Sequence, residues 1–261
     1  MASLTTASWA DGPLLAFDLE TTGTDPATDR VVTATVISIL PGRSPSTHTW
    51  LADPGVEIPP EATEVHGIST DHARRHGHAA ATVIAEIADA LAAAWCATTP
   101  LCAFNASFDL SLLHAELRRH HQRDLVLAGP VVDPLCIDHH VDRYRKGKRT
   151  LAALCAHYRV RLEDAHSSAG DGLATARLAW RLARNYPDQV GTVPLGDLHA
   201  RQIDWHRTQQ QSFAGYLERL AGQAEDPTEA DQLRQRAARV QADAGSWPLR
   251  TLPSARGGSF S

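Results

Sequence analysis

The chain has 261 residues, of which 43% are hydrophobic and 21% are charged, a composition typical of one globular domain with additional elements. Its formal net charge of -5 excludes a surface that is basic overall, so any attraction for a polyanion must be local or come from bound cations. The four cysteines form no C-x-x-C pair, which indicates reduced core thiols. Residues 1–13 do not resemble a signal peptide, and no apolar run is long enough to span a membrane. We therefore expect a cytoplasmic protein.

The first clear element is an apolar run over residues 14–20, which ends in the turn signal Thr21-Thr22-Gly23. If this run is a strand, Asp18 and Glu20 face the same side, because side chains alternate between faces. Two carboxylates on a half-buried strand repel each other and lose hydration, which a divalent cation between them would relieve. Oxygen ligands suit Mg²⁺ or Mn²⁺ better than zinc. An exposed edge strand with two solvated acids is the alternative.

The next segments predict an antiparallel meander. Residues 30–40 and 47–51 are strand-like, and residues 54–60 are expected to stay extended because of their prolines. A short helix is expected over residues 70–75. Residues 79–95 carry an apolar stripe at helical spacing, which predicts a helix packed on the core.

From residue 100 onwards, short strands alternate with helices, which argues for an α/β domain with a mixed sheet. Asn105 is a candidate N-cap for the helix that follows the strand at residues 100–104, and this places Asp109 in the first helical turn. The helix dipole alone would stabilise an acid there, so a structural role for Asp109 stands beside a catalytic one.

The two ends of the chain are expected to differ from the domain at residues 13–187. Residues 1–12 are small and polar and are predicted to be disordered, and residues 188–200 are interpreted as a linker. Two amphipathic helices follow within residues 200–245, with a loose tail from residue 247. These helices form a C-terminal extension that could bind a protein partner, mediate self-association or simply pack on the core.

Four acids and one histidine stand at the ends of these elements: Asp18, Glu20, Asp109, His166 and Asp171. Sites in open α/β sheets form where the carboxyl ends of the strands meet. We therefore expect these five side chains to converge.

Four motifs, in this order, resemble the DEDDh (DnaQ-like) family of 3′→5′ exonucleases, which includes the epsilon proofreading subunit of bacterial DNA polymerase III. They are Phe17-Asp18-Leu19-Glu20-Thr21-Thr22-Gly23, Val65-His66-Gly67-Ile68, Phe104-Asn105-Ala106-Ser107-Phe108-Asp109 and His166-x4-Asp171. The resemblance covers roughly residues 14–185 and leaves residues 188–261 outside it.

This resemblance implies a ribonuclease-H-like core, with a five-stranded mixed sheet flanked by helices. It also implies two Mg²⁺ or Mn²⁺ ions about 3.5–4 Å apart that clamp the attacking and leaving oxygens. By analogy, Asp18 bridges both ions, Glu20 and Asp171 complete one shell, and Asp109 acts mainly through the other ion. His166 takes the proton of the attacking water, since the unperturbed pKa of histidine, ~6.5, suits a general base near neutral pH. The product is a nucleoside 5′-monophosphate.

The substrate implied is a single-stranded or frayed 3′ end. Its expected contacts are Leu19, Thr21, Thr22, His66, Asn105 and Phe108 near the terminal nucleotide, with Arg145 and Lys148 on the upstream backbone. His66 could equally be a capping or core histidine. The basic stretch over residues 143–149 could equally be a solvated loop.

Three functions remain open on the sequence alone. The first is a DNA exonuclease of the proofreading or repair type. The second is an exoribonuclease that trims RNA 3′ ends, which these residues do not separate from the first because a 2′-OH contact can come from the backbone or from shape. The third is a docking module with a silent site, which the complete acidic set disfavours.

Overall fold

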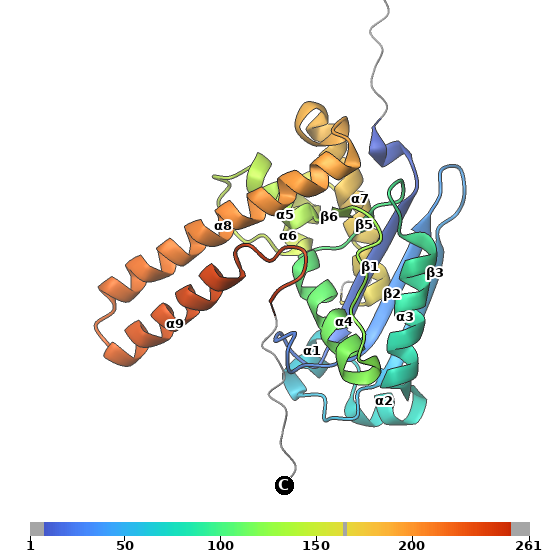
Figure 1. Cartoon of the computed structure of the whole chain (residues 1–261), viewed down its shortest axis with the longest axis horizontal. Helices are drawn as coiled ribbons and strands as arrows, with labels where there is room; N and C mark the ends of the chain where they lie inside the picture. The colour runs from blue at the N-terminus through green and yellow to red at the C-terminus, as the bar shows by residue number, and fades with distance from the viewer. Residues whose placement is uncertain (1–7, 164–165, 252–261) are drawn as a thin grey trace, which may run out of the picture.

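The computed structural model describes residues 8–163 and 166–251, and the expectations for residues 1–7 and 252–261 lie outside this range. One six-stranded sheet has the order β4-β3-β2-β1-β5-β6 (Figure 1). The strands are β1 (Leu14–Thr21), β2 (Val31–Ile39), β3 (Ser46–Asp53), β4 (His78–Ala79), β5 (Leu101–Cys102) and β6 (Val131–Val132). The helices are α1 (Pro60–His66), α2 (Thr70–His76), α3 (Ala80–Ala94), α4 (Ala106–His121), α5 (Pro134–Val141), α6 (Leu151–Tyr158), α7 (Ser168–Asn185), α8 (Leu195–Gln223) and α9 (Pro227–Asp243).

The sheet confirms the predicted α/β architecture with one correction. Strands β1, β2 and β3 form the expected antiparallel meander, and β5 and β6 continue the sheet parallel to β1. The expected count of five strands is wrong, because β4 pairs in parallel with the end of β3. A strand of only two residues has no periodicity for a sequence pattern to detect.

The two faces of β1 pack against different helices, and this decides where the acids point. Leu15, Phe17 and Leu19 join the main core with α3 and α4. Ala16 faces the other way and packs with Ala176 of α7. Because side chains alternate along a strand, the acids at positions 18 and 20 share the α7 face with Ala16.

Two segments in the first part of the chain are more ordered than expected. Helix α1 begins at Pro60, where the stretch predicted to stay extended ends, and it is capped by Gly67 with φ 77°, a left-handed conformation that favours glycine. The short helix Trp9–Asp11 lies within the supposedly disordered N-terminus, where Ala10 is 5% exposed.

The supposed linker and tail also pack on the domain. A short helix at Pro187–Gly191 and the start of α8 replace the linker, with Val190 and Leu198 fully buried. Trp247, assigned to the loose tail, is 4% exposed and belongs to the main core. The C-terminal extension is therefore anchored to the domain at both of its ends. No helix in the described ranges is long and apolar enough to cross a bilayer.

Helix α8 covers the edge of the sheet at β6. The side-chain amide of Gln202, which is fully buried, donates to the carbonyl of Val131 at 2.8 Å and accepts from the N–H of Asp133 at 2.8 Å. The N–H of Val131 donates to Nδ1 of His199 at 3.1 Å. These contacts satisfy backbone groups that an edge strand would otherwise leave unpaired.

We expect Gln202→Leu to destabilise the domain, because it leaves a buried carbonyl and a buried N–H without partners, at about 1–3 kcal/mol for each group. Urea unfolding followed by circular dichroism measures this loss. Gln211→Leu is the matched control, since Gln211 is exposed on the same helix. Equal stability of the two variants would contradict the edge-covering role of α8.

Candidate active site

The site is built around the C-terminal end of β1, which carries Asp18 and Glu20. The pairing of β1 with β2 shifts register between Glu20 and Thr21. Such bulges re-aim side chains at the end of a strand. The turn that follows is tied down by Thr22, whose hydroxyl donates to Asp29 at 3.1 Å and accepts the N–H of Arg30 at 3.0 Å.

Helix α7 brings Asp171 to this pair. Ser167 caps the helix by accepting the N–H of Gly170 at 3.1 Å, so Asp171 lies in the first turn. The next residue, Gly172, packs directly on the strand, since a Cβ there would lie 3.7 Å from the Cβ of Asp18. Oδ1 of Asp171 is buried and has no hydrogen-bond partner among the described residues. The predicted convergence of Asp171 with the acids of β1 is therefore supported by close packing.

Asp109 reaches the site from the first turn of α4. Its side chain is buried at 4% exposure, and its Oδ1 accepts the N–H of Leu19 from β1 at 3.2 Å. Asn105 occupies the N-cap position as expected, but its side chain forms no capping hydrogen bond and its φ is 58°. The cap comes from Asp133, whose carboxylate accepts the N–H groups of Asn105 and Ala106, both at 3.0 Å.

The electrostatics of the four acids show that they share one region. Burial raises the pKa of Asp18 well above its usual range, and the charges of Asp109, Glu20 and Asp171 raise it further. Burial, with Asp171 next, raises the pKa of Glu20 to about 7. Burial raises the pKa of Asp109 to about 8, against the opposing effect of the Leu19 N–H. Each acid is thus held at a cost that a cation would offset.

His166 lies at the edge of the cluster, immediately after the undescribed residues 164–165. It is exposed, and its φ of 67° is uncommon for a residue with a Cβ. Burial raises the pKa of Asp171, while the backbone N–H and the imidazole of His166 both act to lower it. His166 is therefore close to the acid that its motif pairs it with.

The donor set fits a hard divalent cation, although its present arrangement is not a complete coordination shell. Within residues 8–163 and 166–251, no three His, Cys, Asp or Glu side chains are placed to hold a metal ion as they stand. However, the acids supply only oxygen ligands, three of them raise the pKa of Asp18, and Oδ1 of Asp171 is buried without a hydrogen-bond partner among the described residues. Rotation of these side chains toward a shared ion would relieve their repulsion.

These shifts predict how stability depends on pH without divalent cations. The folded-state pKa values of Glu20 and Asp109, about 7 and about 8, lie above their unfolded values, so the folded protein binds these protons more tightly. Their contribution to stability is therefore present at low pH and is lost as pH rises toward 8. We expect the unfolding midpoint in EDTA to fall by several degrees between pH 6 and 8.5, and Mn²⁺ to restore it more at pH 8.5.

Differential scanning calorimetry measures this trend. Asp109→Asn removes one of the titrating groups, so its midpoint should change less with pH than that of the unmodified protein. Identical pH profiles for the two proteins would contradict the assigned electrostatics.

The predicted contacts to the terminal nucleotide surround the acids but are partly engaged elsewhere. The N–H of Leu19 is used by Asp109, and the hydroxyl of Thr21 donates to the carbonyl of Gly23 at 2.6 Å. His66 closes α1 beside the backbone of Thr21, where burial lowers the pKa of its imidazole. Nδ1 of His66 accepts the N–H of Ile68 at 3.2 Å, so the ring caps the turn after α1. Phe108 is half-buried beside Asp109.

The two basic residues predicted to bind the upstream backbone differ in their surroundings. Arg145 is paired at 2.8 Å with the fully buried carboxylate of Asp138, which also binds Arg149 and accepts the Tyr158 hydroxyl at 2.8 Å. Lys148 is exposed. Arg145 therefore has a structural use, and only Lys148 of the two is displayed freely at the surface.

The sequence reasoning missed three residues that shape the site. A capping role was not predicted for Asp133, although Asp before Pro at a helix start is a capping signal. Gln202 and Arg250 gave no local signal, because their roles arise only where α8 and the C-terminal segment meet the sheet and α4.

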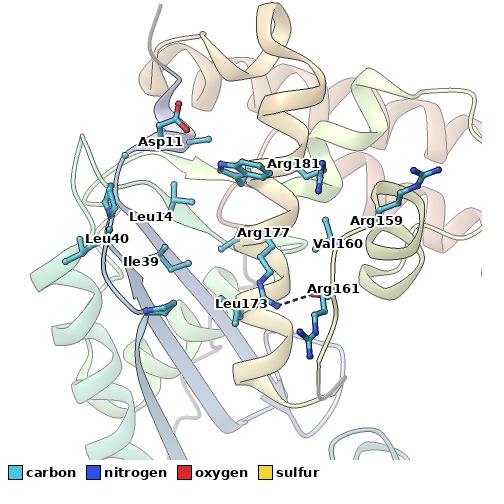
Figure 2. Close-up of a pocket in the computed structure, with 17 residues that line it drawn as sticks. Asp11, Leu14, Ile39, Leu40, Arg159, Val160, Arg161, Leu173, Arg177 and Arg181 are labelled. Atoms are coloured by element: carbon cyan, nitrogen blue, oxygen red, sulfur yellow. Dashed lines mark hydrogen bonds between the residues drawn. The ribbon is translucent and has the colours of Figure 1, made fainter.

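A cavity of about 540 Å³ lies away from the acids, at the other end of β1. Figure 2 shows Leu14, Ile39 and Leu173 on its apolar floor and several arginines around its rim. Leu14 is the first residue of β1, whereas Asp18 and Glu20 lie near its other end. This cavity is therefore separate from the carboxylate site.

The sheet order and the acids at one edge define a ribonuclease-H-like nuclease fold. A model of the exonuclease family RNase_T matches residues 15–179, more than half of the chain. The chain therefore belongs to this exonuclease family, and the predicted DEDDh membership is confirmed.

Curated relatives and solved structures agree with this assignment. A DNA polymerase III PolC-type protein of Streptococcus sanguinis is 24% identical over 75% of this chain and 13% of its own length. The corresponding protein of Streptococcus mutans is 27% identical over 72% of this chain and 12% of its own length. This chain thus spans about an eighth of these relatives.

The solved neighbours support the fold. An exonuclease I–ssDNA complex from E. coli, with zinc bound, has a TM-score of 0.58 at 20% identity and covers 75% of this chain and 43% of its own. E. coli exonuclease I with a dT13 oligonucleotide has a TM-score of 0.55 at 22% identity, over 67% and 42% of the two chains.

Proposed function

We propose that this chain is a metal-dependent 3′→5′ exonuclease that hydrolyses phosphodiester bonds at DNA 3′ ends and releases nucleoside 5′-monophosphates. The observation that carries the proposal is the electrostatic coupling of Asp18 to Asp109, Glu20 and Asp171, with α7 packed on Asp18 at Gly172. Membership of the exonuclease family supports the same chemistry.

The four acids would hold two Mg²⁺ or Mn²⁺ ions. When bound, such ions neutralise charge on the phosphate and make a water molecule more acidic. The acids themselves orient this centre from three different elements: β1 supplies Asp18 and Glu20, α4 supplies Asp109 and α7 supplies Asp171. Burial of Asp109 and its hydrogen bond from Leu19 fix one side of the site.

His166 would act as the general base that accepts a proton from the attacking water. Its imidazole is exposed at the rim of the acid cluster and is close enough to influence the pKa of Asp171. An ionised Asp171 would in turn stabilise the imidazolium that forms.

Substrate contacts are proposed around this centre. Phe108 and His66 would contact the terminal nucleotide, together with the backbone of Leu19, Thr21 and Thr22 and the turn at Asn105. Lys148 would contact the upstream backbone, and Arg145 could do so only by sharing or leaving its pair with Asp138.

DNA is the favoured substrate over RNA. The relatives are PolC-type DNA polymerases, and two solved neighbours hold single-stranded DNA or a dT13 oligonucleotide. An exoribonuclease acting on RNA 3′ ends is the second candidate. A silent docking module is disfavoured, because a buried acid whose pKa three other carboxylates raise is costly to keep without a cation.

The hairpin of α8 and α9 is the proposed surface for a protein partner or self-association within residues 200–245. The two helices pack on each other through Ala214, Leu217 and Ala237, and Tyr216 remains 47% exposed. Figure 1 shows the hairpin extending away from the sheet. All four cysteines are free, in keeping with the reducing cytoplasm in which we propose that the chain acts.

A degradation assay tests the function. DNA and RNA oligonucleotides of one sequence, labelled at the 5′ end, are incubated with the protein at increasing Mg²⁺ or Mn²⁺. The expected result is a ladder of products shortened from the 3′ end on DNA, with nucleoside 5′-monophosphate released. Cleavage that survives complete chelation, or release of the 5′ label as a mononucleotide at the start of reaction, would contradict the proposal. A faster RNA ladder would favour the second candidate.

A further inference from the structure

The segment after α9 returns to the active site. Figure 1 shows it turning back from the hairpin toward α4. Trp247 is 4% exposed within the main core and its ring lies 5.1 Å from that of His199 on α8. Leu249 packs against the same core. The N–H of Arg250 then donates to Oγ of Ser111 on α4 at 2.8 Å, so the backbone of Arg250 is fixed two residues along α4 from Asp109.

The side chain of Arg250 lies beside Phe108 of α4, and it forms no ion pair with any described carboxylate. Its guanidinium carbon lies 6.0 Å from the centre of the Phe108 ring. Burial lowers the pKa of Arg250, while the charges of Asp243, Asp109 and Asp25 raise it. Within the described residues, however, no ion pair joins Arg250 to any of these acids, whereas Arg145 and Arg149 are both paired with Asp138. A partly buried guanidinium beside a catalytic acid therefore keeps its hydrogen-bonding capacity free.

We propose that Arg250 binds a phosphodiester group of the substrate strand next to its 3′-terminal nucleotide. This inference rests on the proposed exonuclease function. The planar guanidinium presents five donors, which suit phosphate oxygens, and it can stack on an aromatic face at the same time. Phe108 and Arg250 together form a ring with a cation beside it, next to Asp109. The chain's net charge of -5 makes such a local cation useful for holding a polyanion.

The anchoring of the C-terminal segment explains how a residue outside the family match could serve the site. The match ends at residue 179, and Arg250 comes 71 residues later in the sequence. Trp247 in the core and the hydrogen bond to Ser111 hold the intervening backbone on both sides of Leu249. The alternative is that Arg250 only fastens the tail to Phe108, and this alternative predicts no dependence on substrate phosphates.

Changing Arg250 and the substrate phosphates together distinguishes phosphate binding from a purely structural role of Arg250. Full-length unmodified protein, Arg250→Ala and Arg250→Lys are compared on dT12 and on two dT12 strands that carry a neutral methylphosphonate at the second or the third linkage from the 3′ end. Release of the terminal nucleotide gives kcat and KM. Arg234→Ala is the control, because Arg234 is an exposed arginine on α9 paired at 2.9 Å with Asp231.

We expect Arg250→Ala to lower kcat/KM on dT12 about 10- to 100-fold, mostly through KM, and Arg250→Lys to recover part of this loss. In the unmodified protein, one of the two neutral linkages should cause a similar loss. In Arg250→Ala, the same neutral linkage should lower kcat/KM by less than about twofold, because the contact is already absent. Arg234→Ala should match the unmodified protein on every substrate.

Three outcomes would overturn the inference. Both neutral linkages could leave the unmodified protein unaffected, an outcome that needs no variant and so holds even if Arg250→Ala folds poorly. The losses from Arg250→Ala and the neutral linkage could multiply, as expected for a merely structural residue. Finally, an unmodified protein that degrades no strand would remove the proposed function itself, whereas normal degradation by Arg250→Ala would remove only the role of Arg250.

Discussion

Asp18→Ala is expected to abolish cleavage, with kcat lowered by about 10³-fold or more, while the fold is retained. Asp18 is the acid on which the other three charges act together, so it is the group best placed to share both proposed ions. Its removal also takes one charge out of a repelling cluster. The midpoint of thermal unfolding in EDTA should therefore stay unchanged or rise at pH 8.

This combination of lost activity and preserved stability is the diagnostic result. Cleavage of labelled DNA and calorimetry on the same preparation measure both. Asp89→Ala is the matched control, because Asp89 is 75% exposed and forms only a surface pair with Arg123 at 3.5 Å. Retained cleavage by Asp18→Ala, or a large fall in its unfolding midpoint without cations, would contradict a metal-binding role.

The first half of the fold was predictable because its signals are local. Alternation along β1 placed Asp18 and Glu20 on one face, and the β-branched run over β2 marked its strand. The apolar residues of helices α3 and α7 pack into the hydrophobic core. By contrast, β4 has two residues, and α1 has seven and begins at the second of two adjacent prolines, so neither has a pattern long enough to detect.

The sequence was enough to propose the site residues, but not the tertiary contacts that hold them in place. The five proposed site positions could be selected from spacing and from the family resemblance, since the acids lie near a strand end or in a first helical turn and His166 lies just before α7. That Gly172 lets α7 approach the Cβ of Asp18 is a property of tertiary packing. The same holds for Gln202, whose amide completes an edge strand 69 residues away in the sequence.

Charge patterns in the sequence do not show which charges are free. The basic stretch over residues 143–149 looked like a binding patch, but Asp138 is fully buried and engages Arg145 and Arg149. A buried carboxylate needs such partners, because its desolvation is otherwise uncompensated. Meanwhile Arg250, which stood in a presumed loose tail, is held by α4 through Ser111 and lies beside Phe108.

His166→Ala is expected to lower kcat by about 10²- to 10⁴-fold while DNA binding is retained, because a general base acts on the water and not on the strand. The substitution also removes a positive influence on Asp171, whose pKa His166 acts to lower. Fluorescence anisotropy with a labelled oligonucleotide measures binding, and single-turnover cleavage measures the chemical step.

The backbone at this position supplies a matched control. His166 has φ 67°, where alanine is disfavoured but asparagine is tolerated. His166→Asn therefore keeps the loop conformation while removing the base, so both variants should lose the same rate if proton transfer is the cause. If His166→Asn instead turned over normally at pH 7, the role of His166 would be to hold the loop and cap Asp171. Added imidazole that restores cleavage to His166→Ala, but leaves its DNA affinity unchanged, would place the defect in the proton transfer itself.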